Sequence, residues 1–523
     1  MSARSSASPA EGSLATHSVE ALRGLVSRSS SQFSKRRLAF AALGVVFAVG
    51  GAGARADVCP QPCDSFVTGT PVSDPRVDHV VIDGVKVDVL LPAGYVGSRR
   101  SYPVLYLLNS ALADQDEYLT ATDLVRFTAQ LPGAQQAIVV LPFGGLFGFY
   151  SDWRDGSYRW EHFDIDTLIP YVDAHYRTRA DRAHRAVAGF SMGGFGAISY
   201  AARHPELFTV AGSFSGQVDP AIPRMETFLP GFMLFIDSVC GQTYQPLGLW
   251  GNPATDAVWW RDHDPTDLAG NLSGVSLYFA SGNGVPCQPD ELQENPLATY
   301  LESLGYEQAQ NFDAALTTAG VAHTADLYGC GTHVYRFVQR DIHRFWPQML
   351  AAFGSASPSS FDYRRADPHS SAWGWTFTAD PRRAAEFLDI THASPAGLTL
   401  RGSGTETVTT PPLWDPGQAV DVHGGSPTHV RADSAGRVTF TVGLGAPHRK
   451  QQYTLAQQLS PELFVTRTIR FDRAGGSRSS KSKSGCQPFH HPHHQTTTRA
   501  PTQSRGRHDL KPRRCKTPHR RHH

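Results

Sequence analysis

The sequence has almost no net charge and no apolar run that could comfortably form a permanent membrane helix. Its 523 residues include 48 Lys and Arg against 47 Asp and Glu, a formal net charge of +1 at pH 7. This balance gives no general attraction to nucleic acid or to acidic membranes, so nucleic acid is not expected as a partner. The most apolar stretch, residues 38–50, is short and rich in glycine, so no stable membrane span is predicted.

The motifs that bind common cofactors are missing as well. No G-x-G-x-x-G follows a predicted strand, and neither a P-loop nor an H-E-x-x-H sequence occurs. We therefore expect no cofactor, and the candidate site residues include no metal ligands. The length of the chain leaves room for a large core and for more than one domain.

The N-terminal segment has the features of a secretory signal peptide. Basic residues 35–37 precede the apolar stretch 38–50, and Ala54-Arg55-Ala56 follows as an A-x-A cleavage site. We therefore predict that the protein is secreted, with cell-wall association as a further hypothesis. An uncleaved anchor is the alternative interpretation. Residues 1–56 are left out of the predicted fold.

The sequence contains only seven cysteines. Cys59 and Cys63 have C-x-x-x-C spacing, but no partner pair of His or Cys follows nearby, so disulfides are favoured over a zinc site. Export would permit such bonds. Cys287 and Cys330 both fall in loops after late predicted strands, and a disulfide between them is a hypothesis.

The most informative stretch is residues 186–196, A-V-A-G-F-S-M-G-G-F-G, which contains a G-x-S-x-G pattern at Gly189, Ser191 and Gly193. Residues 185–188 can form a short buried strand, and residues 197–203 have helical spacing. The pattern therefore predicts a nucleophile elbow, in which a sharp strand-to-helix turn presents the serine hydroxyl. A glycine-rich turn with a chance serine is the alternative.

Strand and helix patterns alternate over residues 77–353. The predicted strands are 77–91, with a hairpin turn at Asp83-Gly84, 102–108, 137–141, 185–188, 208–213, 275–280 and 324–328. The predicted helices are 117–130, 164–176, 197–203, 291–304, 309–319 and 335–353. This alternation predicts a doubly wound, mostly parallel α/β sheet of the α/β-hydrolase type, and residues 57–354 are assigned to it as the catalytic domain.

Residues 216–271 interrupt this alternation and are rich in Trp, Phe, Pro and Met. Such an insertion can form a lid or the wall of an acyl-chain pocket, or it can be ordinary core packing. Exposed and buried apolar segments look alike in a sequence, so both interpretations stay open.

The C-terminal part differs in character. After a linker-like stretch at residues 355–360, strand-like runs separated by Gly, Pro and Asp predict a small β-sandwich-like module over residues 361–472. Its position suggests the hypothesis that it binds cell-wall polysaccharide. Residues 473–523 form a basic, His-rich tail with almost no aliphatic side chains, so we predict disorder. The histidines at 490, 491, 493 and 494 could bind metal or polyanions, but a solvated tail is favoured.

A serine nucleophile needs a general base and an acid that orients the base. In this fold the chain order is Ser, then Asp or Glu, then His. His333 follows the last predicted strand, whereas His323 begins that strand and His343 lies within the final helix. His333 is therefore the predicted base.

The acid and the oxyanion donors are less constrained by position. The candidate acids after strand 275–280 are Asp290, Glu291, Glu294 and Glu302. Asp290 lies in the loop where this fold usually places its acid, but sequence order alone does not decide. The oxyanion hole needs two backbone N–H donors, which we assign to Met192 and to either Ala111 or Leu112.

Residues from about 102 to 349 resemble the esterase D-type α/β-hydrolases, and among them the secreted mycolyltransferases of the antigen 85 group. The resemblance rests on Y-L-L-N-S at 106–110 with Asp114 and Asp116, G-F-Y-S-D-W at 148–153, G-F-S-M-G-G at 189–194, L-W-G-N-P at 249–253, H-D-P-T-D at 263–267, S-G-N-G at 281–284, Y-L-E-S at 300–303 and G-T-H at 331–333.

The resemblance implies Ser191 as nucleophile and His333 as base. It implies Glu302 as the acid, because the family's catalytic Glu stands in the L-E dipeptide of that helix. The implied activity is that of a serine esterase or acyltransferase, of a mycolyl- or diacylglycerol-transferring kind, which acts on acyl esters through an acyl-enzyme with water, a sugar or glycerol as acceptor.

The sequence departs from the family at three places. Residues 111–113 lack the family's acceptor-binding Arg, Tyr335 stands where the family has Trp, and the module at 361–472 is additional. These departures leave the residues for serine ester chemistry unchanged. They affect the inference about which substrate and acceptor the protein binds. A non-catalytic secreted binding protein is the alternative function, and a peptidase on the same fold is a third.

Overall fold

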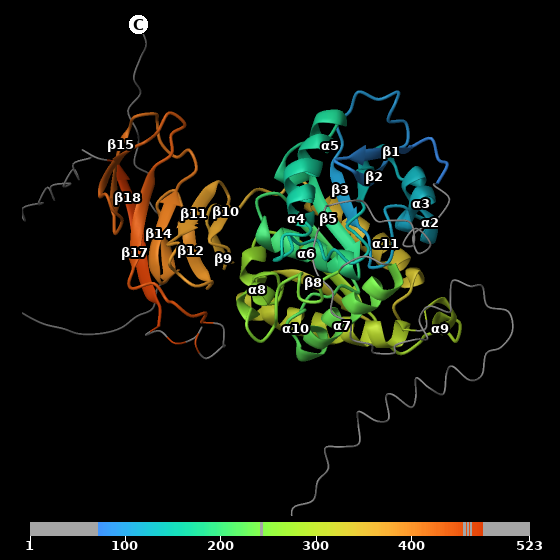
Figure 1. The fold of residues 1–523 in the computed structure, drawn as a ribbon. Coiled ribbons are helices and arrows are strands. Elements are labelled where there is room, and N and C mark those ends of the chain that lie inside the picture. The colour runs from blue at the N-terminus through green and yellow to red at the C-terminus, as the bar shows by residue number, and fades with distance from the viewer. Residues whose placement is uncertain are drawn as a thin grey trace, which may run out of the picture. The chain divides into compact units, whose positions relative to one another are not determined.

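The computed structural model describes residues 72–240, 244–295, 297–452, 457, 460 and 463–473 (Figure 1). The predicted signal peptide and residues 474–523 of the predicted tail lie outside this set, as do Cys59, Cys63 and the four tail histidines. No helix in the described part of the chain combines the length and the apolar character that a bilayer crossing requires.

The first part of the chain forms an eight-stranded sheet in the order β1-β2-β4-β3-β5-β6-β7-β8. The strands are β1 (Val77–Ile82), β2 (Val85–Leu90), β3 (Val104–Leu108), β4 (Ile138–Pro142), β5 (Arg185–Phe190), β6 (Val210–Phe214), β7 (Ser276–Ser281) and β8 (His323–Leu327). β1 and β2 form an antiparallel hairpin, β2 also runs antiparallel to β4, and all pairs from β4 to β8 are parallel. This confirms the predicted α/β-hydrolase sheet.

Alternate side chains of the central strands enter two separate apolar cores, because successive residues of a strand point to opposite faces. Val104 and Tyr106 contribute to one core, and Leu105 and Leu107 to the other. The first face is covered by α5 (Ile169–His175), α6 (Met192–Arg203) and α10 (Ala298–Ala319). The second is covered by α2 (Glu117–Ala121), α3 (Leu124–Gln130) and α11 (Tyr335–Ala352).

Two helix predictions were wrong about continuity. The predicted helix 117–130 is split into α2 and α3, because Thr122 is extended and its Oγ1 accepts the N–H of Leu124 at 3.2 Å. Conversely, the predicted helices 291–304 and 309–319 are replaced by the short α9 (Glu291–Glu294) and the continuous 22-residue α10. Gly305 lies inside α10 without ending it, since a glycine in a helix interior costs only about 1 kcal/mol relative to alanine.

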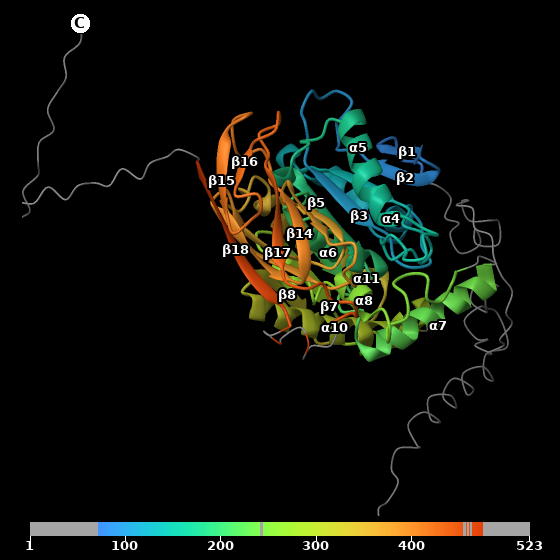
Figure 2. The same ribbon diagram turned by 60° about the vertical axis from the view of Figure 1, so that its left-hand side comes forward.

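The insertion at 216–271 contains α7 (Pro223–Cys240) and α8 (Ala257–Asp262). Trp250 and Trp260 are buried in the main core, as ordinary core packing requires. Helix α7 packs Met225, Leu229 and Met233 into the same core and also carries a row of half-buried phenylalanines. It lies beside α10 in both views (Figures 1 and 2). Core packing is therefore present in both parts of the insertion, and a role of α7 as a lid or as the wall of an acyl-chain pocket stays a prediction.

The C-terminal part consists of a four-stranded and a six-stranded antiparallel sheet that share one apolar core, as in a sandwich (Figure 1). Their orders are β10-β11-β14-β17 and β16-β15-β18-β13-β12-β9. The bounds are β9 (Phe361–Arg365), β10 (His369–Ala372), β11 (Trp375–Ala379), β12 (Leu388–Ser394), β13 (Gly397–Gly402), β14 (Gly404–Thr409), β15 (Ala419–His423), β16 (His429–Arg431), β17 (Thr439–Leu444) and β18 (Val465–Arg473).

One buried tyrosine links the ends of the two central strands. Tyr118 of α2 donates its hydroxyl hydrogen to the carbonyl of Leu108 at 2.7 Å and accepts the N–H of Phe190 at 2.8 Å. Leu108 ends β3 and Phe190 ends β5, so this hydroxyl holds both strand ends at the edge from which the elbow departs.

We expect Tyr118→Phe to lower the free energy of unfolding by about 1–3 kcal/mol, because it leaves buried backbone groups without a partner. Urea unfolding followed by tryptophan fluorescence measures this change. Tyr300→Phe is the control, since Tyr300 is exposed. Equal losses of stability in the two variants would contradict the assignment.

Candidate active site

Ser191 lies at a strained strand-to-helix turn. It directly follows β5, precedes α6 and has φ 56° and ψ −116°, a left-handed φ that non-glycine residues rarely adopt. Its N–H donates to the carbonyl of Phe214 at 2.9 Å. A Cβ on Gly193 would clash with the carbonyl oxygen of Leu108, so the helix can approach the sheet only with glycine there. The predicted elbow geometry is therefore present around Ser191.

His333 is oriented by Glu302. Its Nδ1 lies 2.9 Å from Oε2 of Glu302, and both side chains are buried. The Nδ1–H donates to this carboxylate, which leaves Nε2 as the hydrogen-bond acceptor. The other carboxylate oxygen, Oε1, accepts hydrogen bonds from Ser215 Oγ at 2.7 Å, Ser281 Oγ at 3.0 Å and the Gly282 N–H at 2.7 Å.

The parallel sheet brings these residues together from distant parts of the chain. Phe190, Phe214 and Ala280 are aligned in register near the carboxyl ends of β5, β6 and β7. Ser191 and the groups that bind Glu302 follow directly. The rings of Phe190 and His333 lie 4.4 Å apart, which places the imidazole against the residue before Ser191.

The hydroxyl of Ser191 has no hydrogen-bond partner among the described residues, and the side chain is half-buried. Catalytic hydrogen bonds of this kind are often long or poorly aligned before substrate binds. The residue is therefore accessible to a substrate and is held in place by its backbone.

The other acids and histidines considered from the sequence have different partners. Asp290 is exposed and pairs with Arg336 at 2.7 Å, and this hydrogen bond lowers the pKa of the carboxyl. Glu291 is buried but accepts the hydroxyl of Thr332 at 2.7 Å. His323 pairs with Asp313 and His343 with Asp123, at 2.9 and 2.8 Å. Only the side chain of Glu302 among the described candidate acids contacts His333; the side chain of Glu294 lies outside the described set.

The oxyanion loop follows β3 and is held by Asn109. Its side-chain nitrogen donates to the carbonyl of Ala113 at 3.0 Å, and its side-chain oxygen accepts the N–H of Gly144 at 2.8 Å. Leu112 has φ 60°, and its own N–H donates to the carbonyl of Leu146 at 2.8 Å. This bond leaves Ala111 as the better of the two predicted donors.

Met192 is the first residue of α6, so its N–H has no acceptor within the helix. The N–H of Ala111 has no acceptor in the part of the chain that the structure describes. Both donors are therefore available to an oxyanion, and the positive end of the helix dipole adds to the field there.

Sequence reasoning missed Glu117, a buried residue that supports this loop. Its carboxylate accepts the N–H of Ser110 at 2.8 Å, the hydroxyl of Ser110, and the hydroxyl of Tyr335 at 3.0 Å. Burial raises the pKa of Glu117 to about 7. Ser110 directly precedes Ala111, so its hydrogen bonds to Glu117 hold the backbone that carries the Ala111 N–H.

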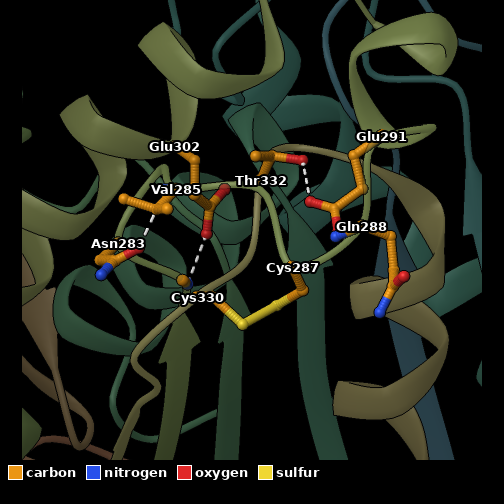
Figure 3. The surroundings of a disulfide bond; sticks show 9 residues. Asn283, Val285, Cys287, Gln288, Glu291, Glu302, Cys330 and Thr332 are labelled. Carbon is orange, nitrogen blue, oxygen red and sulfur yellow. Dashed lines mark hydrogen bonds between the residues drawn. A yellow bond between two sulfur atoms is a disulfide. The ribbon is translucent and has the colours of Figure 1, made fainter.

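Cys287 and Cys330 form a disulfide, which confirms that hypothesis. Figure 3 shows the bond beside Glu302, between the loops that follow β7 and β8. Two hydrogen bonds also join these loops. The hydroxyl of Thr332 donates to Glu291, and the N–H of Gly331 donates to the carbonyl of Val285 at 2.8 Å. The disulfide thus restrains the segment that carries His333.

Comparison with known proteins places the chain in a family. Residues 82–349, slightly more than half of the chain, match the family model Esterase, described as "Putative esterase". The chain belongs to this esterase family. Its mostly parallel sheet and elbow are those of the α/β-hydrolases, as described above.

The curated relatives include Esterase Rv1288 of Mycobacterium tuberculosis (strain ATCC 25618 / H37Rv), 34% identical over 265 residues that cover 48% of this chain and 52% of the relative. This chain thus spans about half the length of that relative. Diacylglycerol acyltransferase/mycolyltransferase Ag85A of Mycobacterium ulcerans is 28% identical over 65% of this chain and 98% of its own length. Among solved structures, MPT51 of Mycobacterium tuberculosis is 20% identical over 54% of this chain and all of its own, with a TM-score of 0.43.

The raised pKa of Glu117 predicts a pH-dependent contribution to stability. Below about pH 4.5 this carboxyl is protonated in both the folded and the unfolded state, and its contribution is fully present. As the pH rises, the carboxyl ionises near pH 4.5 in the unfolded state but only near pH 7 in the folded state. The stabilising contribution is therefore lost over this range.

Glu117→Gln should abolish this loss. We expect the stability of the variant relative to wild type to increase by about 3 kcal/mol between pH 4 and pH 8. Urea unfolding at a series of pH values measures the difference. Asp290→Asn is the control, because the pKa of that exposed carboxyl is lowered and its pH dependence has the opposite sign. A pH-independent difference for Glu117→Gln would contradict the prediction.

Proposed function

We propose that this protein is a secreted serine esterase or acyltransferase that acts on acyl esters through an acyl-enzyme intermediate. The observation that carries the proposal is the buried Glu302–His333 pair, with Nδ1 bound to the carboxylate, beside the strained elbow of Ser191. Membership of the esterase family supports the same chemistry.

In the proposed reaction, Oγ of Ser191 attacks the ester carbonyl while Nε2 of His333 takes the hydroxyl proton. Glu302 stabilises the imidazolium that forms. The N–H groups of Met192 and Ala111 bind the oxyanion of the tetrahedral intermediate. The intermediate expels the alcohol, which takes the proton from His333, and an ester bond to Ser191 remains. Water or an acceptor hydroxyl then attacks this ester and gives its proton to His333. The bond between the acyl carbon and Oγ of Ser191 breaks, and Oγ takes the proton back from His333.

The aromatic side chains of α7 favour a substrate whose acyl group carries an alkyl chain. Phe228 and Phe232 stack at 5.2 Å, and Phe232 lies 5.0 Å from Phe147. Phe147 follows Leu146, whose carbonyl holds Leu112 of the oxyanion loop. At its other end the row reaches Tyr300, two residues before Glu302, at 6.1 Å from Phe228. An apolar row between the oxyanion loop and the acid suits an acyl chain.

We assign the acceptor only by class, as water or as a hydroxyl of a sugar or of glycerol. The relatives named diacylglycerol acyltransferase/mycolyltransferase support transfer, whereas those named esterase support hydrolysis. Both reactions share every step before the acceptor attacks. For the sandwich at residues 361–472 we keep the hypothesis of cell-wall polysaccharide binding, which the predicted export would favour.

Two substitutions test the catalytic assignment on p-nitrophenyl esters. Ser191→Ala should abolish measurable turnover and labelling by a fluorophosphonate probe. Glu302→Gln should keep the hydrogen bonds in part but lower kcat by about 10²–10⁴-fold, because the carboxylate no longer stabilises the imidazolium. The matched control is Asp290→Asn, since this acid also follows β7 but pairs with Arg336 at the surface; its activity should stay within about twofold of wild type.

A wild-type protein that neither turns over esters nor reacts with the probe would overturn the proposal in favour of a binding protein. A large loss in Asp290→Asn with little loss in Glu302→Gln would assign the acid to the loop after β7.

Removing one phenylalanine ring from the row on α7 tests whether this row binds the acyl chain. Phe232→Ala should lower kcat/KM for a twelve-carbon ester by about tenfold and leave a two-carbon ester nearly unchanged, since the lost apolar contact is worth about 1–3 kcal/mol. Leu234→Ala on the same helix is the control, because Leu234 is 50% exposed. Equal effects on short and long esters would argue against an acyl-binding role for this row.

A further inference from the structure

A second cluster of ionisable side chains lies at the antiparallel end of the sheet and takes no part in the proposed reaction. His79 of β1 is directly opposite Asp88 of β2, and its Nδ1 lies 2.6 Å from Oδ1 of Asp88. Asp116, which immediately precedes α2, comes from the loop after β3. One potential ligand atom from each of the three residues lies within 4.8 Å of the others.

The two carboxylates are buried but incompletely bonded. Asp88 is 1% exposed and Asp116 is 3% exposed. Oδ2 of Asp88 and Oδ1 of Asp116 have no hydrogen-bond donor in the described part of the chain. Taking a carboxylate out of water without a partner is costly, and two together also repel each other.

The charged neighbours do not balance this pair. The side chain of Asp114 acts on Asp116 as a further negative charge. The cation that acts on Asp114 is Lys86, whose side chain is exposed. The cluster therefore combines an excess of negative charge with two oxygen atoms that lack a donor.

We propose that His79, Asp88 and Asp116 bind a divalent cation, and that Zn²⁺ is the ion that suits them best. An imidazole nitrogen with two carboxylate oxygens is a common donor set for zinc, with water completing the coordination. Nε2 of His79 faces the carbonyl of Val72 at 3.4 Å. A proton on Nε2 would leave the lone pair of Nδ1 for the metal.

Binding requires only a small rearrangement. Two ligands at about 2.0–2.1 Å from a tetrahedral zinc ion lie about 3.3 Å apart, so His79 and Asp88 must separate slightly from their direct contact. The side chain of His79 is 41% exposed, which permits this rotation and gives the ion a path from solvent.

The ion would have a structural effect close to the candidate active site. It would connect the β1–β2 hairpin to Asp116, and the next residue, Glu117, holds Ser110 in the oxyanion loop. We therefore assign the three residues as metal ligands that support the loop, and no step of the ester reaction passes through the metal.

A proton shared between Asp88 and Asp116 is the competing explanation, because it would satisfy the same two oxygen atoms without a metal. The two explanations differ in zinc stoichiometry and in the response of the melting temperature to zinc, and an experiment can measure both.

The test uses the full chain after treatment with EDTA and dialysis. Zinc stoichiometry is measured by competition with a chromophoric chelator, and Tm is measured with and without Zn²⁺, Ca²⁺ or Mg²⁺. Wild type is compared with Asp116→Asn and His79→Ala. Asp83→Asn is the matched control, since it removes the same charge from the exposed turn of the same hairpin and lies outside the cluster. The tail has the same sequence in all four proteins, so differences between them report this cluster.

We expect wild type and Asp83→Asn to bind one more Zn²⁺ per chain than the other two variants. Zinc should raise the Tm of the first two proteins by about 3 °C more than that of Asp116→Asn and His79→Ala. If Asp116→Asn fails to fold, His79→Ala preserves the test, because its side chain is exposed.

Equal zinc stoichiometry and equal Tm shifts in all four proteins would overturn the proposal and favour the shared proton. A response to Ca²⁺ but not to Zn²⁺ would overturn the choice of zinc. Since the readouts are metal content and Tm, failure here is distinguishable from failure of the proposed ester chemistry.

Discussion

The candidate site depends on one buried carboxylate. Glu302 comes from α10, and its two oxygens receive hydrogen bonds from Ser215, Ser281, the Gly282 N–H and His333. A fully buried charge is tolerated only when it is bonded in this way. The donors lie at or after the ends of β6, β7 and β8, so the carboxylate joins the ends of neighbouring strands and fixes the histidine in the same set of bonds.

The surrounding contacts hold the other reacting groups against this centre. Tyr118 links the ends of β3 and β5, and Glu117 holds the loop that offers Ala111. The disulfide between Cys287 and Cys330 restrains the loop of His333. These groups lie behind the proposed reacting atoms, and they keep donors and base in place before a substrate arrives, which is how preorganised sites lower reaction barriers.

Much of the fold could be predicted from the sequence because the signals are local. The G-x-S-x-G pattern lies between a strand and a helix, and the buried strands are continuous apolar runs. Helix boundaries were harder, because Thr122 uses its side chain to end one helix and begin the next. The predicted break between residues 304 and 309 was also wrong, because α10 continues through this segment and a single glycine costs a helix only about 1 kcal/mol.

The sequence by itself determined the sheet class, the candidate nucleophile at Ser191 and the histidine at 333, because local periodicity and chain order constrain them. Sequence order left the acid open, the family resemblance implied Glu302, and the structure places that residue against His333. The tertiary structure alone decided that the Leu112 amide is already bonded and that Glu117 supports the oxyanion loop. It also brought His79 and Asp88 next to Asp116. The physical reason is that these are contacts between segments far apart in the chain, and side-chain partners across a sheet have no signature in local spacing.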